Sequence, residues 1–239
     1  MDLAENFENI RRRIAEACAR AKRDPGEVQL LAVTKGHGPD AVAAAVAAGQ
    51  RLFGENKVQE AKAKIPLCPG RLHWHMIGHL QSNKCRDAVQ TFDMIEGVDS
   101  LSLAAEIDKQ ANKSGKTIPI LLEVNLAGEA SKFGYKPAAL LAEFASINDL
   151  RNIEVHGLMT VPPYSPNPER SRQYFKQLRD LKAQCETILG VPLPHLSMGM
   201  SGDFEIAIEE GATIVRVGTA LFGPRRYAKT AKQPEAETQ

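Results

Sequence analysis

A lysine at the end of an apolar run is the first residue here that could do chemistry. Residues 28–35 read Val-Gln-Leu-Leu-Ala-Val-Thr-Lys, the composition of a buried parallel strand. Burying an ammonium group in such a strand is costly, so we expect Lys35 where the apolar wall meets an open pocket. Desolvation there lowers a lysine's pKa, and a free amine condenses with aldehydes and ketones. The alternative is that Lys35 only marks where the strand meets water.

Two loops that contain glycine and hydroxyl residues indicate an anion site. Residues 197–203 and 217–220 each follow an apolar run. Glycines let backbone amides approach an anion, and hydroxyl groups add further donors. Taken singly, each loop is explained as an ordinary turn, with Ser201 as a helix N-cap. Together, at the last two strand ends of a barrel, they favour a phosphate site formed by Ser201, Gly218 and Thr219.

Arg216 lies among aliphatic residues of the last predicted strand and must face a polar partner. One interpretation is an ion pair with a carboxylate of a neighbouring strand, such as Glu123 or Glu55. The other is a donor aimed at a ligand bound between the first and last strands, which are neighbours in a closed barrel. The sequence leaves both open.

Three histidines form the pattern H-x-H-x-x-x-H. On a strand, His73 and His75 share a face, and such a pair can chelate zinc. A metal-dependent hydrolase would need further ligands at the strand ends, whereas His156 and His195 lie early in their predicted strands. We therefore expect no metal site, and we assign His79, just past its strand, to the pocket.

The composition narrows the class of protein. The chain has 239 residues, 43% hydrophobic and 25% charged, as in soluble globular proteins. Lys plus Arg number 30 against 29 Asp plus Glu, so nothing favours nucleic acid as a partner. The polar start and the lack of a long apolar segment predict no export signal and no membrane span. Four scattered cysteines predict no disulfide or zinc site and fit a reducing cytoplasm: Cys18, Cys68, Cys85 and Cys185.

Strand and helix patterns alternate along the whole chain after an amphipathic helix over residues 2–23. We expect strands at 28–35, 51–54, 73–77, 94–98, 117–125, 153–159, 195–198 and 212–217, with helices between them. This predicts one domain over residues 1–239, an α/β (β/α)8 TIM-type barrel with an extra N-terminal helix. Its core spans about 10–225, and 227–239 form a polar tail. A doubly wound open sheet is the alternative. In such a barrel the residues that follow the strands line one site. Asn56, which follows the predicted strand over 51–54, is therefore a further candidate.

Five blocks of sequence resemble a known family. They are LAVTK (31–35), FGENKVQE (53–60), WHMIGHLQSNK (74–84), LSMGMSGD (196–203) and VRVGTALFG (215–223). In this order they resemble the pyridoxal phosphate homeostasis protein family from about residue 10 to 225. The resemblance implies a barrel like the N-terminal domain of alanine racemase and pyridoxal 5′-phosphate (PLP) bound as an aldimine on Lys35. It assigns the phosphate to Ser201, Gly218 and Thr219 and the pyridine nitrogen to Arg216.

The resemblance also puts Asn56 and His79 in the cofactor pocket. It implies a role in vitamin B6 and amino-acid or oxo-acid homeostasis, with no established reaction and with PLP-dependent apoenzymes as recipients. One departure is visible, because Gly36-His37-Gly38 replaces the usual Thr and Pro after the lysine. This loosens the loop beside Lys35.

A permanently charged Arg216 opposes protonation of the pyridine nitrogen and weakens the ring as an electron sink. Related racemases also carry a C-terminal β-domain that supplies a second acid/base residue, for which this chain has no room. We therefore expect cofactor binding without efficient catalysis, by a cytoplasmic monomer. The alternatives are a PLP-dependent amino-acid racemase-like enzyme and a Schiff-base aldolase that acts on sugar phosphates without a cofactor.

Overall fold

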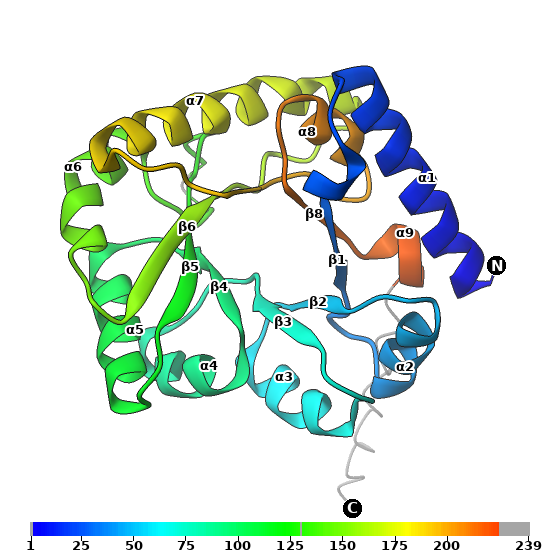
Figure 1. The fold of residues 1–239 in the computed structure, drawn as a ribbon, viewed down its shortest axis with the longest axis horizontal. Helices are drawn as coiled ribbons and strands as arrows, with labels where there is room; N and C mark the ends of the chain where they lie inside the picture. The colour runs from blue at the N-terminus through cyan, green and yellow to red at the C-terminus, as the bar shows by residue number, and fades with distance from the viewer. Residues whose placement is uncertain (1, 130, 225–239) are drawn as a thin grey trace, which may run out of the picture.

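Eight parallel strands close into a barrel in chain order (Figure 1). The computed structural model describes residues 2–129 and 131–224. Each strand pairs with the next one along the chain, and β8 pairs with β1, so the sheet has no free edge. The strands are β1 (Gln29–Val33), β2 (Leu52–Glu55), β3 (His73–Met76), β4 (Met94–Val98), β5 (Ile118–Glu123), β6 (Ile153–Met159), β7 (His195–Ser197) and β8 (Ile214–Val217). The predicted barrel is confirmed, and the open sheet is excluded.

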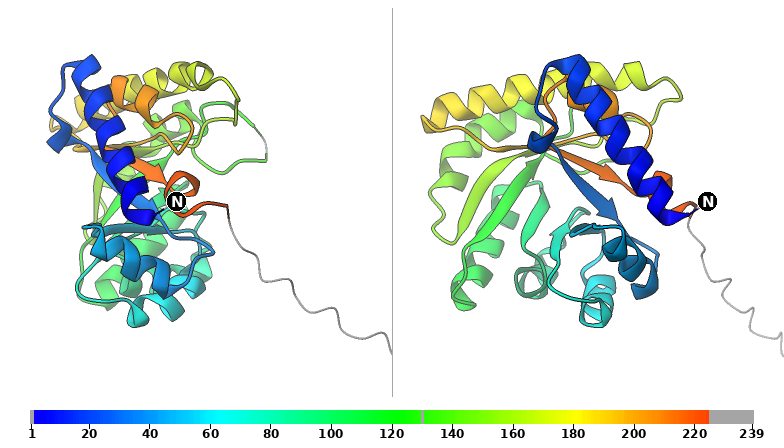
Figure 2. Two further views of the ribbon diagram at one scale, coloured as in Figure 1. Left: turned by 90° about the vertical axis from the view of Figure 1, so that its right-hand side faces the viewer. Right: turned by 45° about the vertical axis from the view of Figure 1, so that its right-hand side comes forward.

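Helices surround this barrel and shield its outer face (Figures 1 and 2). They are α1 (Leu3–Ala21), α2 (Pro39–Ala47), α3 (Val58–Lys64), α4 (Cys85–Thr91), α5 (Leu101–Lys113), α6 (Pro137–Asn148), α7 (Arg172–Leu189), α8 (Phe204–Glu209) and α9 (Thr219–Phe222). Short 3-10 turns occur at Pro25–Glu27, Ile65–Leu67, Ser82–Lys84 and Pro168–Ser171. Among the described helices, none is long and apolar enough to cross a membrane.

The extra N-terminal helix α1 follows directly from its sequence pattern. The Asp2 side chain caps the first turn by accepting a hydrogen bond from the amide of Ala4. Apolar residues at helical spacing, among them Phe7 and Ile14, are buried where α1 packs against α8 and α9. Lys22 ends the helix in the left-handed conformation. The predicted helix over 2–23 is confirmed.

The barrel has an outer and an inner core. The outer core joins the strands to the ring of helices and includes the fully buried Phe53, Phe144 and Phe175. The inner core is a small apolar cluster of residues from five strands: Leu31, Val33, Met94, Leu121, Met159 and Ile214. Like the interior of other TIM-type barrels, this one is packed with side chains and is not a pore.

A bulge in β6 lets that strand follow its neighbours. The register against β5 shifts by one residue between Val155 and Gly157, which leaves His156 extra. A Cβ atom at position 157 would lie 1.9 Å from the carbonyl oxygen of His195, and φ there is +154°. Only glycine fits at this close approach of two backbones. The polar tail predicted for residues 227–239 lies outside the described residues.

Candidate functional site

Three predicted residues follow β8, β1 and β2 and lie at one end of the barrel. Val33 pairs with Gly54 across β1 and β2, and the register of β8 against β1 brings Gly218 against Val33. The strand β1 ends at Val33, so Lys35 lies two residues later in a turn and is partly buried. Asn56 follows β2 on one side of this turn, and Gly218 follows β8 on the other.

The loops after β7 and β8 are joined by a hydrogen bond. The amide of Ala220 donates to Oγ of Ser201 over 3.3 Å, although 19 residues separate them. Ser201 is not the cap of the following helix, as one interpretation of the sequence held. Asp203 holds that position at the start of α8, and its carboxylate accepts from the amide of Met200 at 2.8 Å. The two glycine-containing loops therefore form one surface, and Ser201 belongs to it.

A layer of polar side chains lies inside the barrel around Arg216. The two terminal guanidinium nitrogens of Arg216 donate to Oγ of Ser197 at 2.7 Å and to the carbonyl of Thr160 at 2.8 Å. Ser197 in turn donates to a carboxylate oxygen of Glu96 at 2.5 Å. The other oxygen of Glu96 is 2.7 Å from Nδ1 of His75. These side chains are all buried, and Glu96 is fully buried.

This layer corrects the ion pair considered for Arg216. Glu55 does not reach Arg216, because its carboxylate is bonded to Lys64 instead. Glu123 acts on Arg216 only through its charge. The buried carboxylate linked to Arg216 is Glu96, through the hydroxyl of Ser197. Glu96 was not among the residues predicted from the sequence. Its place within the apolar strand Met-Ile-Glu-Gly-Val could have identified it, because a buried carboxylate needs a polar partner.

The charge of Glu96 is well supported. Burial alone raises the pKa of a carboxyl group. Here the hydrogen bond and charge of His75, the charge of Arg216 and the hydroxyl of Ser197 together outweigh burial and hold the pKa of Glu96 below its usual range. We conclude that the layer holds an anionic Glu96 beside a cationic Arg216.

Glu123 is the last residue of β5. Unlike that of Glu96, its carboxyl group is not surrounded by enough favourable partners to lower its pKa. Burial, with the negative charges of Asp99 and Glu96, outweighs Arg216 and raises the pKa of Glu123 to about 7. The folded protein therefore binds this proton more tightly than the unfolded chain does between about pH 4.5 and pH 7, and stability falls as pH rises through that window.

We expect Glu123→Gln to remove this loss of stability. The variant should unfold with a free energy on the order of 1–2 kcal/mol higher than the unchanged protein at pH 8. The difference should shrink toward zero at pH 5, where Glu123 is protonated. Urea unfolding of the cofactor-free protein at both pH values measures it. A difference that stays constant with pH would show that Glu123 does not titrate in this window.

Asn56 and His79 lie together in a pocket of about 440 Å³ after β2 and β3, which Lys57 and Lys84 also line. The side-chain oxygen of Asn56 is buried and makes no hydrogen bond with the described residues. His79 is more exposed, lies 3.2 Å from the carboxylate of Asp99 and stacks on Phe133 with ring centroids 3.5 Å apart. The structure thus brings Asn56 and His79 to one pocket, with His79 at its rim.

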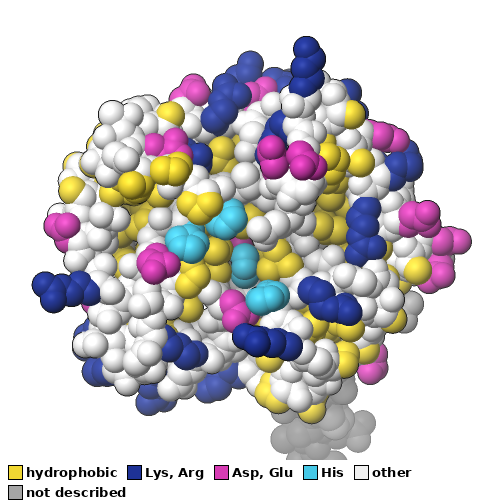
Figure 3. Space-filling model, in the orientation of Figure 1, with side chains coloured by type: hydrophobic (Ala, Val, Ile, Leu, Met, Phe, Trp, Pro, Cys, Tyr) yellow, Lys and Arg dark blue, Asp and Glu magenta, His cyan; other side chains and the backbone are white. Residues whose placement is uncertain are grey.

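The other histidines do not form a metal centre. Among residues 2–129 and 131–224, no group of three or more His, Cys, Asp or Glu is placed to hold a metal ion. His75 is bonded to Glu96, and His156 lies 6.1 Å from His195 between ring centroids. Figure 3 shows histidines gathered at the middle of one face of the molecule. Asn125, the last residue of the strand predicted over 117–125, lies beyond the end of β5 and bonds to its own loop at Gly128 and Glu129.

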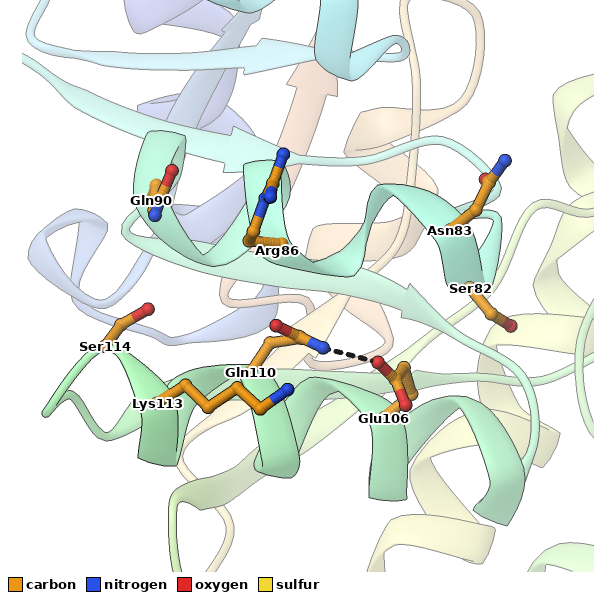
Figure 4. Close-up of a pocket in the computed structure, with 8 residues that line it drawn as sticks. All are labelled: Ser82, Asn83, Arg86, Gln90, Glu106, Gln110, Lys113 and Ser114. Atoms are coloured by element: carbon orange, nitrogen blue, oxygen red, sulfur yellow. Dashed lines mark hydrogen bonds between the residues drawn. The ribbon is translucent and has the colours of Figure 1, made fainter.

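A larger hollow of about 680 Å³ lies outside the barrel between α4 and α5 (Figure 4). Its lining is polar, and Gln110 donates to Glu106 within it at 2.6 Å. None of the predicted site residues lines this hollow. We therefore place the candidate site at the carboxyl ends of the strands, where barrels of this type carry their chemistry.

Comparison with known proteins identifies the family of this chain. Residues 5–226 match the family model "Alanine racemase, N-terminal domain". The chain is 43% identical over 228 residues to a pyridoxal phosphate homeostasis protein of Aquifex aeolicus, covering 95% of this chain and all of that protein. It is 44% identical over 232 residues to one of Pseudomonas aeruginosa, covering 96% and 98%.

Solved structures give the same result. The structure of PipY of Synechococcus elongatus, determined with PLP bound, superposes on this chain with a TM-score of 0.78 at 42% sequence identity. The match covers 88% of this chain and 100% of PipY. An alanine racemase of Bartonella henselae, 17% identical with a TM-score of 0.70, shares the fold over 94% of this chain and 59% of its own. On these matches and this barrel, the chain belongs to the pyridoxal phosphate homeostasis protein family.

Proposed function

We propose that this protein binds PLP, with Lys35 as its covalent anchor, and acts in vitamin B6 and amino-acid or oxo-acid homeostasis. The observation that carries the proposal is the position of Lys35, two residues past the end of β1, at the same end of the barrel as the loops of Ser201 and Gly218. A phosphorylated aldehyde needs both an amine to condense with and amide and hydroxyl donors for its phosphate.

The remaining residues fit the same cofactor. The unpaired buried oxygen of Asn56 is an acceptor for a donor on a ligand. Arg216 makes two hydrogen bonds with the described residues out of five N–H donors, so it has donors for a ring nitrogen. Thr219, at the start of α9, adds a hydroxyl beside Gly218, and His79 borders the pocket. When bound, PLP supplies a reactive aldehyde and an electron-withdrawing ring.

We propose that the protein holds and releases this cofactor without efficient catalysis. The names of its relatives support this role, because they describe homeostasis proteins and not enzymes. A fixed positive charge at Arg216 also disfavours protonation of the ring nitrogen, on which broad carbanion chemistry relies. On this proposal the recipients of the cofactor are PLP-dependent apoenzymes, and the protein acts as a monomer in the cytoplasm. Light scattering of the purified protein tests whether it is a monomer.

The second candidate is a racemase-like activity, favoured by the shared barrel. Incubation of the PLP-loaded protein with amino acids in deuterated water separates the two. A carrier leaves the α-proton in place over many hours. Steady exchange that disappears in Lys35→Ala would instead establish the enzyme.

The visible absorbance spectrum tests the proposed function directly. Protein incubated with PLP should show a long-wavelength band that disappears on reduction with borohydride, and mass spectrometry should locate the reduced adduct on Lys35. If no such band forms after incubation, the proposal is refuted, and the alternative of a Schiff-base aldolase without a cofactor is favoured. Trapping by borohydride only with a sugar phosphate present would then identify that activity.

Ser201→Ala is expected to weaken PLP binding by on the order of 1–3 kcal/mol, because one donor to the phosphate is lost. Titration followed by fluorescence measures the affinity. Ser146→Ala, at an exposed serine of α6 outside these two loops, is the control. An affinity equal to that of the control would mean that Ser201 only links the two loops through Ala220.

A further inference from the structure

We propose that Lys64 and Glu60, both on α3, position Lys35 by holding the backbone on either side of it. This inference rests on the proposed role of Lys35 and adds two residues that lie outside the cofactor pocket. Both side chains contact the turn that carries Lys35.

Lys64 fixes the residue before Lys35. Its ammonium group, 5% exposed, donates to the backbone carbonyl of Thr34 at 2.7 Å and to a carboxylate oxygen of Glu55 at 2.7 Å. The same oxygen of Glu55 accepts from the hydroxyl of Thr34 at 2.5 Å. Both the side chain and the carbonyl of Thr34 are therefore held by one buried cluster.

Glu60 fixes the residue after Lys35. Its Oε1 accepts from the amide of Gly36 at 2.6 Å and from the ammonium of Lys64 at 3.0 Å. Burial raises the pKa of Glu60, but the amide of Gly36 and the charge of Lys64 outweigh it and hold that pKa below its usual range. A charged Glu60 thus bridges Lys64 to the backbone just beyond Lys35.

The local sequence explains why this turn needs a tether. The strand β1 ends at Val33, so Lys35 lies beyond it, in a turn. Gly36 and Gly38 follow it, and Gly36 has φ of +75°. Glycines give a turn conformational freedom, which must be restrained if the amine is to point at one place. A buried lysine is costly, and a hydrophobic residue there would serve packing better. The bonds of Lys64 to the carbonyl of Thr34 and to the carboxylate of Glu55 explain its buried position.

The test uses two variants and a control on the same helix. Lys64→Met removes the ammonium at similar length, and Glu60→Ala removes the acceptor for Gly36 from a partly exposed site. Lys62→Met, which breaks an exposed ion pair with Asp87, is the control. If Lys64→Met does not fold, Glu60→Ala still decides the question.

Two readouts separate positioning from general stability. Amide hydrogen exchange at Gly36 in the cofactor-free protein should be fast in both variants and protected in the control. The rate at which PLP becomes fixed by borohydride should fall about tenfold or more, the scale expected when a reacting group loses its orientation. Binding of pyridoxine 5′-phosphate, which has no aldehyde, should stay unchanged in all three.

The inference is overturned if both variants keep Gly36 protected and capture PLP at the rate of the control. A loss of pyridoxine 5′-phosphate binding equal to the loss of capture would also overturn it, because the effect would then be on the whole site. If the unchanged protein captures no PLP at all, the proposed function fails instead. Exchange at Gly36 then decides alone whether Lys64 and Glu60 hold the turn.

Discussion

Lys35→Ala is expected to abolish covalent capture of PLP. Lys35 is the lysine that follows β1 in the sequence, and alanine in its place has no amine to condense with the aldehyde. The long-wavelength band should be absent, and borohydride should fix no adduct. Part of the affinity should survive, because the phosphate donors are untouched.

The matched control is Lys62→Ala, which removes an exposed lysine of α3 that does not line the pocket of Asn56 and His79. It should keep the band and the adduct at Lys35. Equilibrium dialysis with pyridoxine 5′-phosphate measures the binding that does not depend on the amine, and it should be equal in both variants. An adduct that moves to Lys57 or Lys84 in Lys35→Ala would show that the pocket, and not one lysine, determines capture.

Arg216→Met is expected to destabilise the cofactor-free protein by about 3–5 kcal/mol, as when one member of a buried charge pair is removed. Arg216 and Glu96 are linked through Ser197 inside the barrel, where water cannot solvate the carboxylate that remains. Methionine fills similar volume, so most of the loss is electrostatic and not a cavity. Urea unfolding at pH 7 measures the free energy.

A double variant, Arg216→Met with Glu96→Gln, separates the two causes. Removing both charges should restore a large part of the lost stability, so the two substitutions should not add. Strictly additive losses would mean that Arg216 acts by packing and that Glu96 is independent of it. A loss below about 1 kcal/mol for Arg216→Met alone would contradict the buried pair altogether.

The alternation of strand and helix patterns in about eight units predicted the barrel, but only the structure excluded the doubly wound open sheet. That pattern is local, because side chains repeat every two residues in strands and every 3.6 in helices. The ends of elements were less well determined. The predicted strand over 28–35 ends at Val33, since Thr34 and Lys35 turn away toward α2.

The candidate residues were found where short stretches carry their own chemistry. Lys35 follows an apolar run, and Ser201 and Gly218 lie in glycine-containing loops. Barrel closure then places all three at one end of the barrel, since every parallel strand ends at the same face. Asn56 and His79 were likewise predicted from their place after strands, and they share a pocket.

The sequence by itself determined the fold class, the family and the residues expected to meet PLP. Only the tertiary structure decided which charges pair inside the barrel. Ser197 and Glu96 are 101 residues apart, and their contact depends on the register of separate strands across the closed barrel. In the sequence, Lys64 is one of the lysines in a short helix. Only the packing of α3 against β2 brings it to Thr34. Partners of buried charges depend on closure and register, which no local pattern encodes.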